Sequence, residues 1–481
     1  MSIKTEWRPP VDFPRLDDAK AIAVDLETKD PKLTTHGPGT MRGDGFIAGI
    51  AVGVPTGERW YFPMRHERGV NFAPNAVLAW AKDELCREHQ PKVGANLMYD
   101  MEWLHHEGVP MNGRMIDVQF AEALIDENKR QYSLGSISDK YLGEGKIEEE
   151  LDQYCSEAFG GAPTRKAQAK NYWRAPAQVV GPYAEGDVDL PLRIWPHQQK
   201  AMIEDGVKDL FELEIALIPL LVAMRLHGVR VDLDRAEQVR TLMHRKQQEA
   251  QDKLNTIAGF EVGLWKAEHL ERVFTDLGVS FTRTPKTDKA SITKAWLEAQ
   301  THPAARALHD ARRYDKAIGT FVDGYIYDHQ WNGRIHALFH PLRSDEGGTV
   351  SGRFSSSKPN LQNIPARDPE LGPLIRSMFV GEKGAGWRRY DYSQIEYRLL
   401  AHYAIGEGSD EVRQKYNDNP DTDFHEMTRQ LIYQVTGTLI DRKPTKNINF
   451  GLCYGMGKPK LVRNLGLTVA EGDELFEAYH T

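Results

Sequence analysis

The sequence has few cysteines, no long apolar run and no excess of positive charge. Its three cysteines, Cys86, Cys155 and Cys453, are far apart and form no Cys-x-x-Cys pair. This spacing argues against a disulfide framework or a structural zinc site and fits a reducing cytoplasm. The longest apolar run, residues 215–224, contains Pro219 and is too short to span a bilayer. Residues 2–20 are too polar and too acidic for a secretory signal.

The charge balance also limits the possible functions. The formal net charge is −8, whereas generic nucleic-acid binders usually carry a basic excess. A DNA groove needs only local positive potential, so a nucleic-acid enzyme stays possible. The chain has 481 residues, which is enough for several domains with their own cores. We find no internal repeat and no low-complexity linker.

Hydrophobic periodicity changes along the chain and predicts an α/β region followed by a largely helical one. Residues 1–200 alternate short apolar runs with helical spacing, which is typical of a sheet domain. We expect strands at 21–25, 46–54 and 92–95 and a helix at 75–89. Two long helices should follow, at 211–227 and 233–258, each ended by a glycine, Gly228 and Gly259. Residues 330–481 return to mixed strands, turns and helices.

Acidic residues recur at spacings that place them on common faces. Asp25 and Glu27 are two apart on a predicted strand, so their side chains point the same way. Asn96 and Asp100 are four apart at the start of a helix, and Tyr183 and Asp187 are four apart in a helix that we expect to begin at Gly181-Pro182. Crowded carboxylates repel one another unless cations neutralise them. Mg²⁺ or Mn²⁺ would do so, and a pair of such ions can cleave a phosphodiester.

Taken singly, each of these spacings is common by chance, and Asn96 with Asp100 could be a simple helix cap. In order, however, Val24-Asp-Leu-Glu-Thr28, Val93-Gly-Ala-Asn-Leu-Met-Tyr-Asp100 and Tyr183-Ala-Glu-Gly-Asp187 resemble the three exonuclease motifs of the DEDD superfamily, in its DEDDy branch. The resemblance covers most of residues 15–200. It implies a ribonuclease H-like 3′–5′ exonuclease in which Asp25, Glu27, Asp100 and Asp187 hold two Mg²⁺ or Mn²⁺ ions. Tyr183 would orient the attacking water.

Three later segments carry further polar patterns. Residues 349–365 form a polar stretch rich in turn formers, which we expect to be a loop able to contact a phosphate backbone. In residues 387–402, we expect a strand that ends at Asp391 and turns into a helix carrying Glu396. In 442–455, Arg442, Lys446, Phe450 and Tyr454 recur every fourth residue and share one helical face. That face is cationic at one end and aromatic at the other, so a triphosphate and a base could both bind it. In isolation, the first segment could be an ordinary surface loop. A helix cap for Asp391 and a solvated basic helix for 442–455 would then be the favoured explanations.

Together and in order, these segments resemble the motifs of family A DNA polymerases, the DNA polymerase I family, from about residue 205 onward. The resemblance implies that Asp391 binds a catalytic metal and that Glu396 excludes a ribose 2′-OH. His425, Arg442 and Lys446 would bind the phosphates of a dNTP, and Phe450 and Tyr454 would shape the nucleotide and template pockets. Contacts with primer and template would come from a further set: Arg353, Asn360, Gln362 and Arg367.

This resemblance implies an α/β plus α architecture with four regions. They are an exonuclease domain (1–204), a thumb region (205–335), a partial palm (336–405) and incomplete fingers (406–481). The partners would be primer-template DNA, single-stranded 3′ ends and dNTPs, in the cytoplasm of a bacterium or phage-infected cell and without a membrane.

One expected feature of the family is not found in the sequence. Members carry a later palm motif, a His-Asp-Glu turn, whose aspartate is the second metal ligand. We therefore expect the polymerase site to be incomplete and completed by a separate C-terminal polypeptide. A split gene, an intron, an intein or a truncated fragment would explain this equally well. A free-standing DEDDy exonuclease and a noncatalytic DNA-binding subunit are the alternative functions.

Overall fold

The structure is a computed structural model that describes residues 6–406, 408–437 and 439–480. The chain divides into two compact units, Met1–Gly386 and Trp387–Thr481, and each is described by itself. Within the described residues, none of the helices is both long enough and apolar enough to cross a lipid bilayer.

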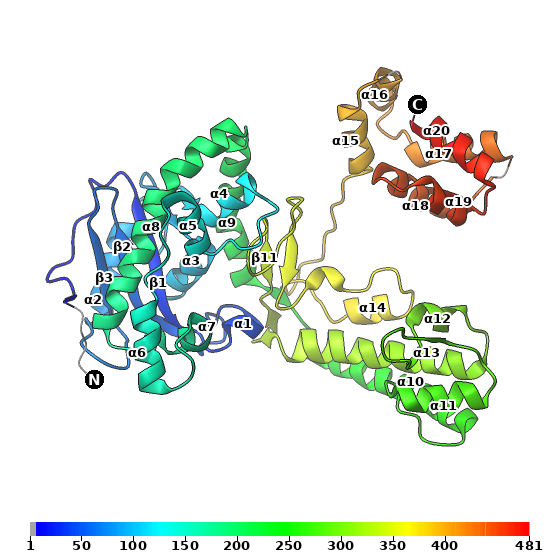
Figure 1. Ribbon diagram of the computed structural model, residues 1–481, viewed down its shortest axis with the longest axis horizontal. Helices are drawn as coiled ribbons and strands as arrows, with labels where there is room; N and C mark the ends of the chain where they lie inside the picture. The colour runs from blue at the N-terminus through cyan, green and yellow to red at the C-terminus, as the bar shows by residue number, and fades with distance from the viewer. Residues whose placement is uncertain (1–5, 407, 438, 481) are drawn as a thin grey trace. The chain divides into compact units, whose positions relative to one another are not determined.

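A five-stranded mixed sheet forms the centre of the N-terminal part of the first unit (Figure 1). Its strands lie in the order β3-β2-β1-β4-β5, with β1 antiparallel to β2 and parallel to β4. The strands predicted near residues 21, 46 and 92 are confirmed. Seven of the eight residues of β2 are buried, as expected for a strand covered on both faces. The strand bounds are β1 (Ile22–Lys29), β2 (Phe46–Gly53), β3 (Arg59–Pro63), β4 (Lys92–Gly94) and β5 (Met115–Asp117).

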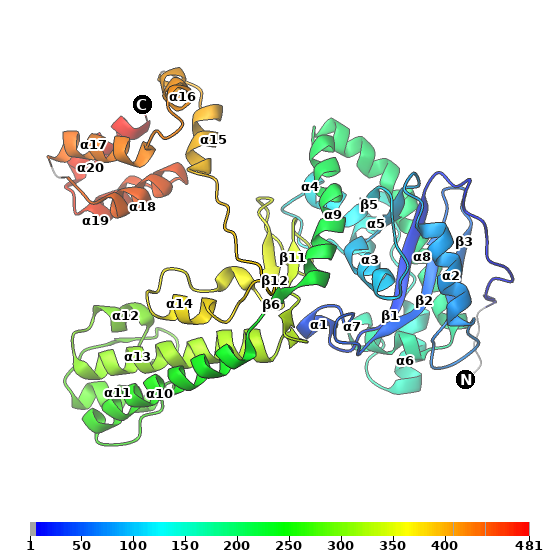
Figure 2. The same ribbon diagram turned by 180° about the vertical axis from the view of Figure 1, so that it is seen from behind.

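Helices surround this sheet, and the longest, α8, packs against β1, β2, β3 and β4 (Figure 1 and, from behind, Figure 2). The helix predicted at 75–89 corresponds to α2. The helices are α1 (Leu33–His36), α2 (Pro74–Leu85), α3 (Leu97–His106), α4 (Val118–Ile125), α5 (Leu134–Leu142), α6 (Glu149–Phe159), α7 (Arg165–Gln168), the 3₁₀ helix η1 (Ala169–Arg174) and α8 (Ala177–Glu204).

The start of α8 differs from the sequence prediction. The helix begins at Ala177, after Pro176, so Pro182 lies in its interior instead of its first turn. Pro191 and Pro196 are interior as well. An interior proline removes one main-chain hydrogen bond and strains the preceding turn. Burial of apolar residues such as Val180 and Val188 against the sheet offsets that cost, which local propensity alone does not show.

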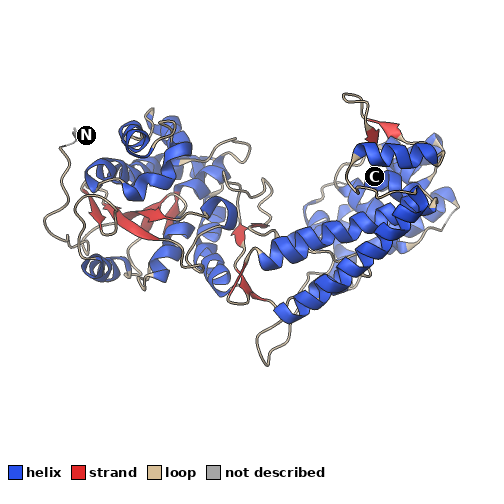
Figure 3. Cartoon of the chain, turned by 90° about the horizontal axis from the view of Figure 1, so that it is seen from below, coloured by secondary structure: helices blue, strands red, loops and turns tan. Residues whose placement is uncertain are grey.

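The rest of the first unit is mainly helical, as the blue helices of Figure 3 show, and α10 and α13 pack along each other (Figure 1). The predicted ends of the two long helices are confirmed, because Gly228 and Gly259 both adopt positive φ angles, 66° and 73°. The helices are α9 (Lys208–His227), α10 (Leu233–Ala258), α11 (Ala267–Asp276), α12 (Lys294–Ala299), α13 (Pro303–Ala317), the π-helix η2 (Ile318–Tyr327), the 3₁₀ helix η3 (Leu361–Asn363) and α14 (Leu371–Arg376).

Short strands link these helices, and one lies in the stretch that we expected to be a loop. Residues 349–365 include β12, which pairs antiparallel with β11, and also η3. Ser356 at the middle of β12 is buried, so part of this polar segment is structural. The strands are β6 (Val229–Arg230), β7 (Thr282–Arg283), β8 (Ala290–Ser291), β9 (Gln330–Trp331), β10 (Arg334–Ile335), β11 (Leu338–His340) and β12 (Ser355–Ser357).

Among its described residues, the second unit contains helices joined by irregular segments and no strand. The predicted helices carrying Glu396 and the Arg442–Tyr454 face are confirmed as α15 and α18, although Tyr454 itself caps the latter. The strand predicted before Asp391 is wrong, because residues 387–391 are irregular and no described residue pairs with them. A strand needs a hydrogen-bonding neighbour. The helices are α15 (Ile395–Tyr403), α16 (Ser409–Asp418), α17 (Phe424–Thr436), α18 (Arg442–Cys453), α19 (Lys458–Leu465) and α20 (Val469–His480).

Candidate metal centre

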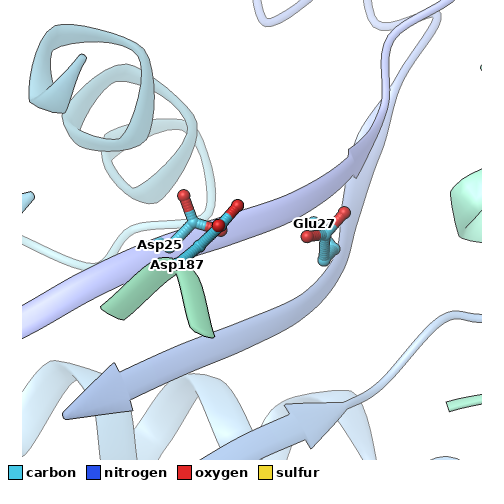
Figure 4. A group of neighbouring side chains, drawn as sticks. All are labelled: Asp25, Glu27 and Asp187. Atoms are coloured by element: carbon cyan, nitrogen blue, oxygen red, sulfur yellow. The ribbon is translucent and has the colours of Figure 1, made fainter. Parts of the chain in front are cut away.

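Three carboxylates from two elements meet beside the central sheet. Asp25 and Glu27 lie on the same face of β1, and Asp187 comes from α8. One carboxylate oxygen from each residue lies within 4.8 Å of the others. Figure 4 shows the carboxylates of Asp25 and Asp187 close together, with Glu27 farther along the strand. The predicted convergence of these residues on one site is therefore found in the structure.

A glycine makes room beside this group. Gly49 on β2 pairs with Glu27 across the sheet, and a Cβ at Gly49 would lie only 2.2 Å from the hydroxyl of Tyr61. Tyr61 is fully buried and lies near enough for the charge of Glu27 to raise its pKa further, after burial itself. An aromatic ring thus fills the space where a side chain at Gly49 would be.

Asp100 lies near the three carboxylates but does not belong to the group within 4.8 Å. It is in the first turn of α3, 3% exposed. Its helix starts after Asn96, which has a φ angle of 66° and so is not itself helical. Asp117 fixes this start, because its Oδ2 accepts a hydrogen bond of 2.8 Å from the amide of Leu97. Burial raises the pKa of Asp100, and the charge of Asp25 is the next cause.

Burial and mutual repulsion disfavour the negatively charged forms of these carboxylates. Burial and the neighbouring Asp187 raise the pKa of Asp25 to about 8. Burial and the charges of Asp25 and Asp187 also raise the pKa of Glu27 well above its usual value. A bound cation favours the ionised form of carboxylates in such surroundings. Oxygen donors of this kind suit Mg²⁺ and Mn²⁺, so the residues fit the metal that the sequence predicts.

Two cations near the carboxylates were not predicted from the sequence. The ammonium of Lys146 ion-pairs with Asp187 at 2.5 Å, and Arg165 pairs with Glu148 at 2.6 Å. Both lower the pKa of Asp25. Lys146 lies between α5 and α6 in a Gly-Glu-Gly-Lys stretch, and nothing in that stretch distinguishes it from the other basic residues of the chain. The position of Lys146 beside the carboxylates is evident only in the folded structure.

Tyr183 lies beside this lysine, one turn before Asp187 on α8. Its ring is 6% exposed, and burial, followed by the charge of Asp187, raises its pKa well above the usual value. Its hydroxyl accepts a hydrogen bond of 3.0 Å from Lys146 Nζ. The phenol is therefore neutral at ordinary pH and still has its own hydrogen to donate.

In the second unit, several residues singled out in the sequence gather around Tyr397. Its ring is 5.0 Å from Phe424, 4.9 Å from His425 and 5.3 Å from Phe450, measured between centroids. Burial lowers the pKa of His425, whose ring also contacts the amide of Asn449 at 3.1 Å. This aromatic cluster holds α15, α17 and α18 together.

The basic residues of α18 lie along the same helix. Lys446 places its ammonium 5.6 Å from the Phe450 ring centroid, and Arg442 pairs with Asp423 at 2.8 Å. Tyr454 is 62% exposed, and Glu396 is partly buried on α15. Asp391 is 76% exposed and lies 3.5 Å from Arg389.

The remaining predicted contact residues belong to the first unit. Asn360 accepts a hydrogen bond from the amide of Gln362, and Gln362 donates to the carbonyl of Phe354. Arg353 and Arg367 are both exposed. These four residues lie in or beside the β12–η3 segment.

The sheet domain with its carboxylate group and the helical region after it correspond to two matched families, a nuclease domain followed by a polymerase domain. The family model for DNA polymerase family A matches residues 233–481, and the model for the 3′–5′ exonuclease matches residues 12–203. The chain belongs to DNA polymerase family A and is a DNA-directed DNA polymerase with a 3′–5′ exonuclease domain.

Relatives agree with this assignment, and a solved structure has a similar fold. The chain is 35% identical to a DNA-directed DNA polymerase of Pseudomonas phage M6, over 97% of this chain and 72% of that protein. It is 30% identical to the DNA polymerase DpoZ of Acinetobacter phage SH-Ab 15497, over 95% and 73%. The fold is similar to the polymerase domain of Pol1 from M. smegmatis, solved in complex with DNA primer-template and dNTP. That match has a TM-score of 0.70 and 21% identity, over 96% of this chain and 73% of that one.

Proposed function

We propose that Asp25, Glu27, Asp100 and Asp187 form the active site of the exonuclease domain and remove nucleotides from single-stranded 3′ ends of DNA. The observation that carries this proposal is the group formed by the partly buried Asp25 and the buried Glu27 and Asp187, with the buried Asp100 beside it. Two Mg²⁺ or Mn²⁺ ions held there would supply an activated water and stabilise the charge on the leaving oxygen.

The protein's own groups set the geometry for this reaction. β1 fixes Asp25 and Glu27 on one face, and α8 brings Tyr183 and Asp187 to the same place. The neutral phenol of Tyr183 donates a hydrogen bond to the attacking water and so orients that water. Burial excludes bulk water and strengthens each of these interactions.

Replacing Asp25 and Glu27 by alanine should lower metal-dependent 3′–5′ digestion at least about a thousandfold, ~4 kcal/mol of transition-state stabilisation. Digestion is measured with a 5′-labelled single strand and Mg²⁺, and DNA binding by fluorescence anisotropy should stay near the wild-type value. The matched control is Asp139→Ala with Glu150→Ala, two exposed acids of the same domain, which should digest normally. Undiminished digestion by the Asp25/Glu27 variant would place the nuclease elsewhere.

We further propose that the second unit binds the incoming dNTP and that the β12–η3 segment contacts primer and template. Arg442, Lys446 and His425 would meet the phosphates, and Phe450 and Tyr454 the nucleotide and template bases. Glu396 would exclude the ribose 2′-OH. The closeness of His425, Phe450 and Lys446 in the structure supports this assignment. For the primer and template, the exposed Arg353 and Arg367 supply positive charge, and Asn360 and Gln362 supply polar groups.

The polymerase metal site, in this proposal, needs a ligand from a further palm segment. Among the described residues, the one group of three or more closely spaced metal-ligating side chains is that of Asp25, Glu27 and Asp187, so Asp391 belongs to no such group. A single exposed carboxylate cannot hold a pair of ions. The missing ligand would come from a polypeptide that carries the His-Asp-Glu turn of the family.

Primer extension tests this second proposal. Residues 1–481 alone should trim 3′ ends but not extend a primer, and adding a polypeptide with the remaining palm should restore extension. Asp391→Asn should then abolish the restored extension and leave trimming unchanged. Robust extension by residues 1–481 alone, lost in Asp391→Asn, would show that this chain already holds a second ligand.

A further inference from the structure

A buried lysine lies at the edge of the exonuclease carboxylates. Lys146 is in the loop between α5 and α6, and its side chain is only 6% exposed. Its stem passes over Gly135, where an added Cβ would lie 3.5 Å from Lys146 Cγ. An ammonium group that is so well removed from water is costly unless anions and acceptors surround it. The partners of the Lys146 ammonium are therefore expected to be anions and hydrogen-bond acceptors.

Those contacts join two residues of the proposed active site. Lys146 Nζ ion-pairs with Oδ2 of Asp187, and it donates to the Tyr183 hydroxyl at 3.0 Å. The carboxylate of Glu148 lies 3.8 Å away and is itself paired with Arg165. An ammonium has three hydrogens, so it can serve the carboxylate and the phenol together. One lysine thus bridges two residues that lie a single helical turn apart on α8.

The contact with Tyr183 also fixes the direction of the phenol hydrogen. Because the phenol oxygen accepts from Lys146, its hydrogen must point away from the lysine. A phenol without this partner could rotate its hydrogen between several acceptors. Lys146 therefore acts on the reaction through Tyr183.

The contact with Asp187 works against a divalent ion. An ion that binds Asp187 must share its carboxylate with the ammonium, and the two positive charges repel each other. Binding of the ion therefore weakens the Lys146–Asp187 pair, whereas the hydrogen bond to Tyr183 can persist.

We propose that Lys146 is a positioning residue and the internal cation of the exonuclease site. It neutralises and orients Asp187 before a divalent ion binds, gives up that carboxylate to the ion, and keeps Tyr183 oriented during the reaction. This inference rests on the function proposed above for Asp187 and Tyr183.

Replacing Lys146 by methionine keeps the length of the side chain and removes its charge, so it should have two opposite effects. Affinity for Mn²⁺ should rise about tenfold, because a competing charge is lost. At saturating metal, kcat should fall about tenfold, because Tyr183 loses the group that orients it. Lys146→Arg keeps the charge and should bind Mn²⁺ within about twofold of the wild type.

The decisive measurement is Mn²⁺ binding by the purified chain, followed by the electron paramagnetic resonance signal of free Mn²⁺. The matched control is Lys166→Met, which removes an exposed positive charge from α7 and should leave the affinity unchanged. Tighter binding in Lys146→Met alone supports the proposal, and unchanged or weaker binding overturns it. If Lys146→Met does not fold, Lys146→Gln takes its place with the same expected direction.

A double variant tests the positioning role separately. If Lys146 acts through Tyr183, Lys146→Met added to Tyr183→Phe should not lower kcat further. An additional tenfold loss would contradict that role. The proposed exonuclease function fails if the Asp25/Glu27 variant digests normally. The inference about Lys146 alone fails if that variant is inactive and Lys146→Met binds Mn²⁺ like the wild type.

Discussion

Two acidic positions expected to bind metal, Asp187 and Asp391, have very different surroundings. Asp187 is 5% exposed, lies beside two other carboxylates and pairs with a buried lysine. Asp391 has a side chain that is 76% exposed and a long contact of 3.5 Å with an exposed arginine. An ion pair of that exposed kind contributes little to stability.

The difference shows how each site is built. Asp25, Glu27 and Asp187 come from a strand and a helix that pack directly on each other, so formation of one core also brings these three carboxylates together. Asp391 lies in an irregular segment without a pairing strand among the described residues. The core that assembles the exonuclease site therefore does not fix the position of Asp391.

The largest expected effect comes from a matched pair of substitutions at these positions. Asp187→Asn should lower exonuclease kcat about a thousandfold, because it removes a metal ligand and its charge, ~4 kcal/mol of stabilisation. Asp391→Asn should leave the same rate within about twofold. Both rates come from digestion of a labelled single strand at saturating Mg²⁺. Equal losses in the two variants would remove the distinction between the two positions.

A smaller effect separates the stabilities of the two units. Tyr397 is 1% exposed within the aromatic cluster, so Tyr397→Ala should destabilise the second unit by about 3 kcal/mol or more. Tyr403→Ala, on the same helix but with 73% of the residue exposed, should change stability by less than about 0.5 kcal/mol. Hydrogen exchange should show lost protection in α17 and α18 of Tyr397→Ala, with unchanged exonuclease activity. Protection that is lost equally in the sheet domain would show that the two units do not unfold independently.

The smallest effect concerns pH. Without metal, the raised pKa of Asp25, about 8 against an ordinary 3.8, means that the folded state binds more protons than the unfolded state between those pH values. Stability of the exonuclease domain should therefore fall as pH rises through this range. The raised pKa values of Glu27 and Asp100 act in the same direction.

Thermal melts from pH 5 to 8.5 would measure this dependence. With EDTA, Tm should decrease by several degrees, at about 2–4 °C for each kcal/mol. With Mn²⁺ the decrease should be smaller, because the ion binds the ionised carboxylates. Asp25→Asn with Glu27→Gln should flatten the curve in EDTA. A Tm in EDTA that rises toward pH 8 would contradict the expected sign.

Much of the exonuclease domain could be predicted from the sequence because its signals are local. Alternation on β1 is enough to place Asp25 and Glu27 on one face, and terminal glycines are enough to end α9 and α10. The start of α8 was mispredicted because a proline usually marks a first turn, and only burial against the sheet allows it inside the helix.

Other features depend on contacts between distant residues. The role of Lys146 could not be found, because its partners Tyr183 and Asp187 are far along the chain and its own neighbours are ordinary. The strand before Asp391 was mispredicted because the local sequence does not show whether a pairing neighbour is present. The assignment of nucleotide-binding roles to Arg442 and Lys446 came from resemblance and stays a prediction.

The interior prolines of α8 have a consequence for how the exonuclease site adjusts to its ion. A proline cannot donate to the carbonyl four residues earlier, and Pro191 lies four residues after Asp187. The main-chain bond to the carbonyl of Asp187 is therefore missing, at the residue that we propose to bind both Lys146 and a metal ion. Helices bend at such points. We therefore expect α8 to have a hinge near Asp187. Bending at this hinge would move Asp187 toward or away from β1 while the sheet stays rigid.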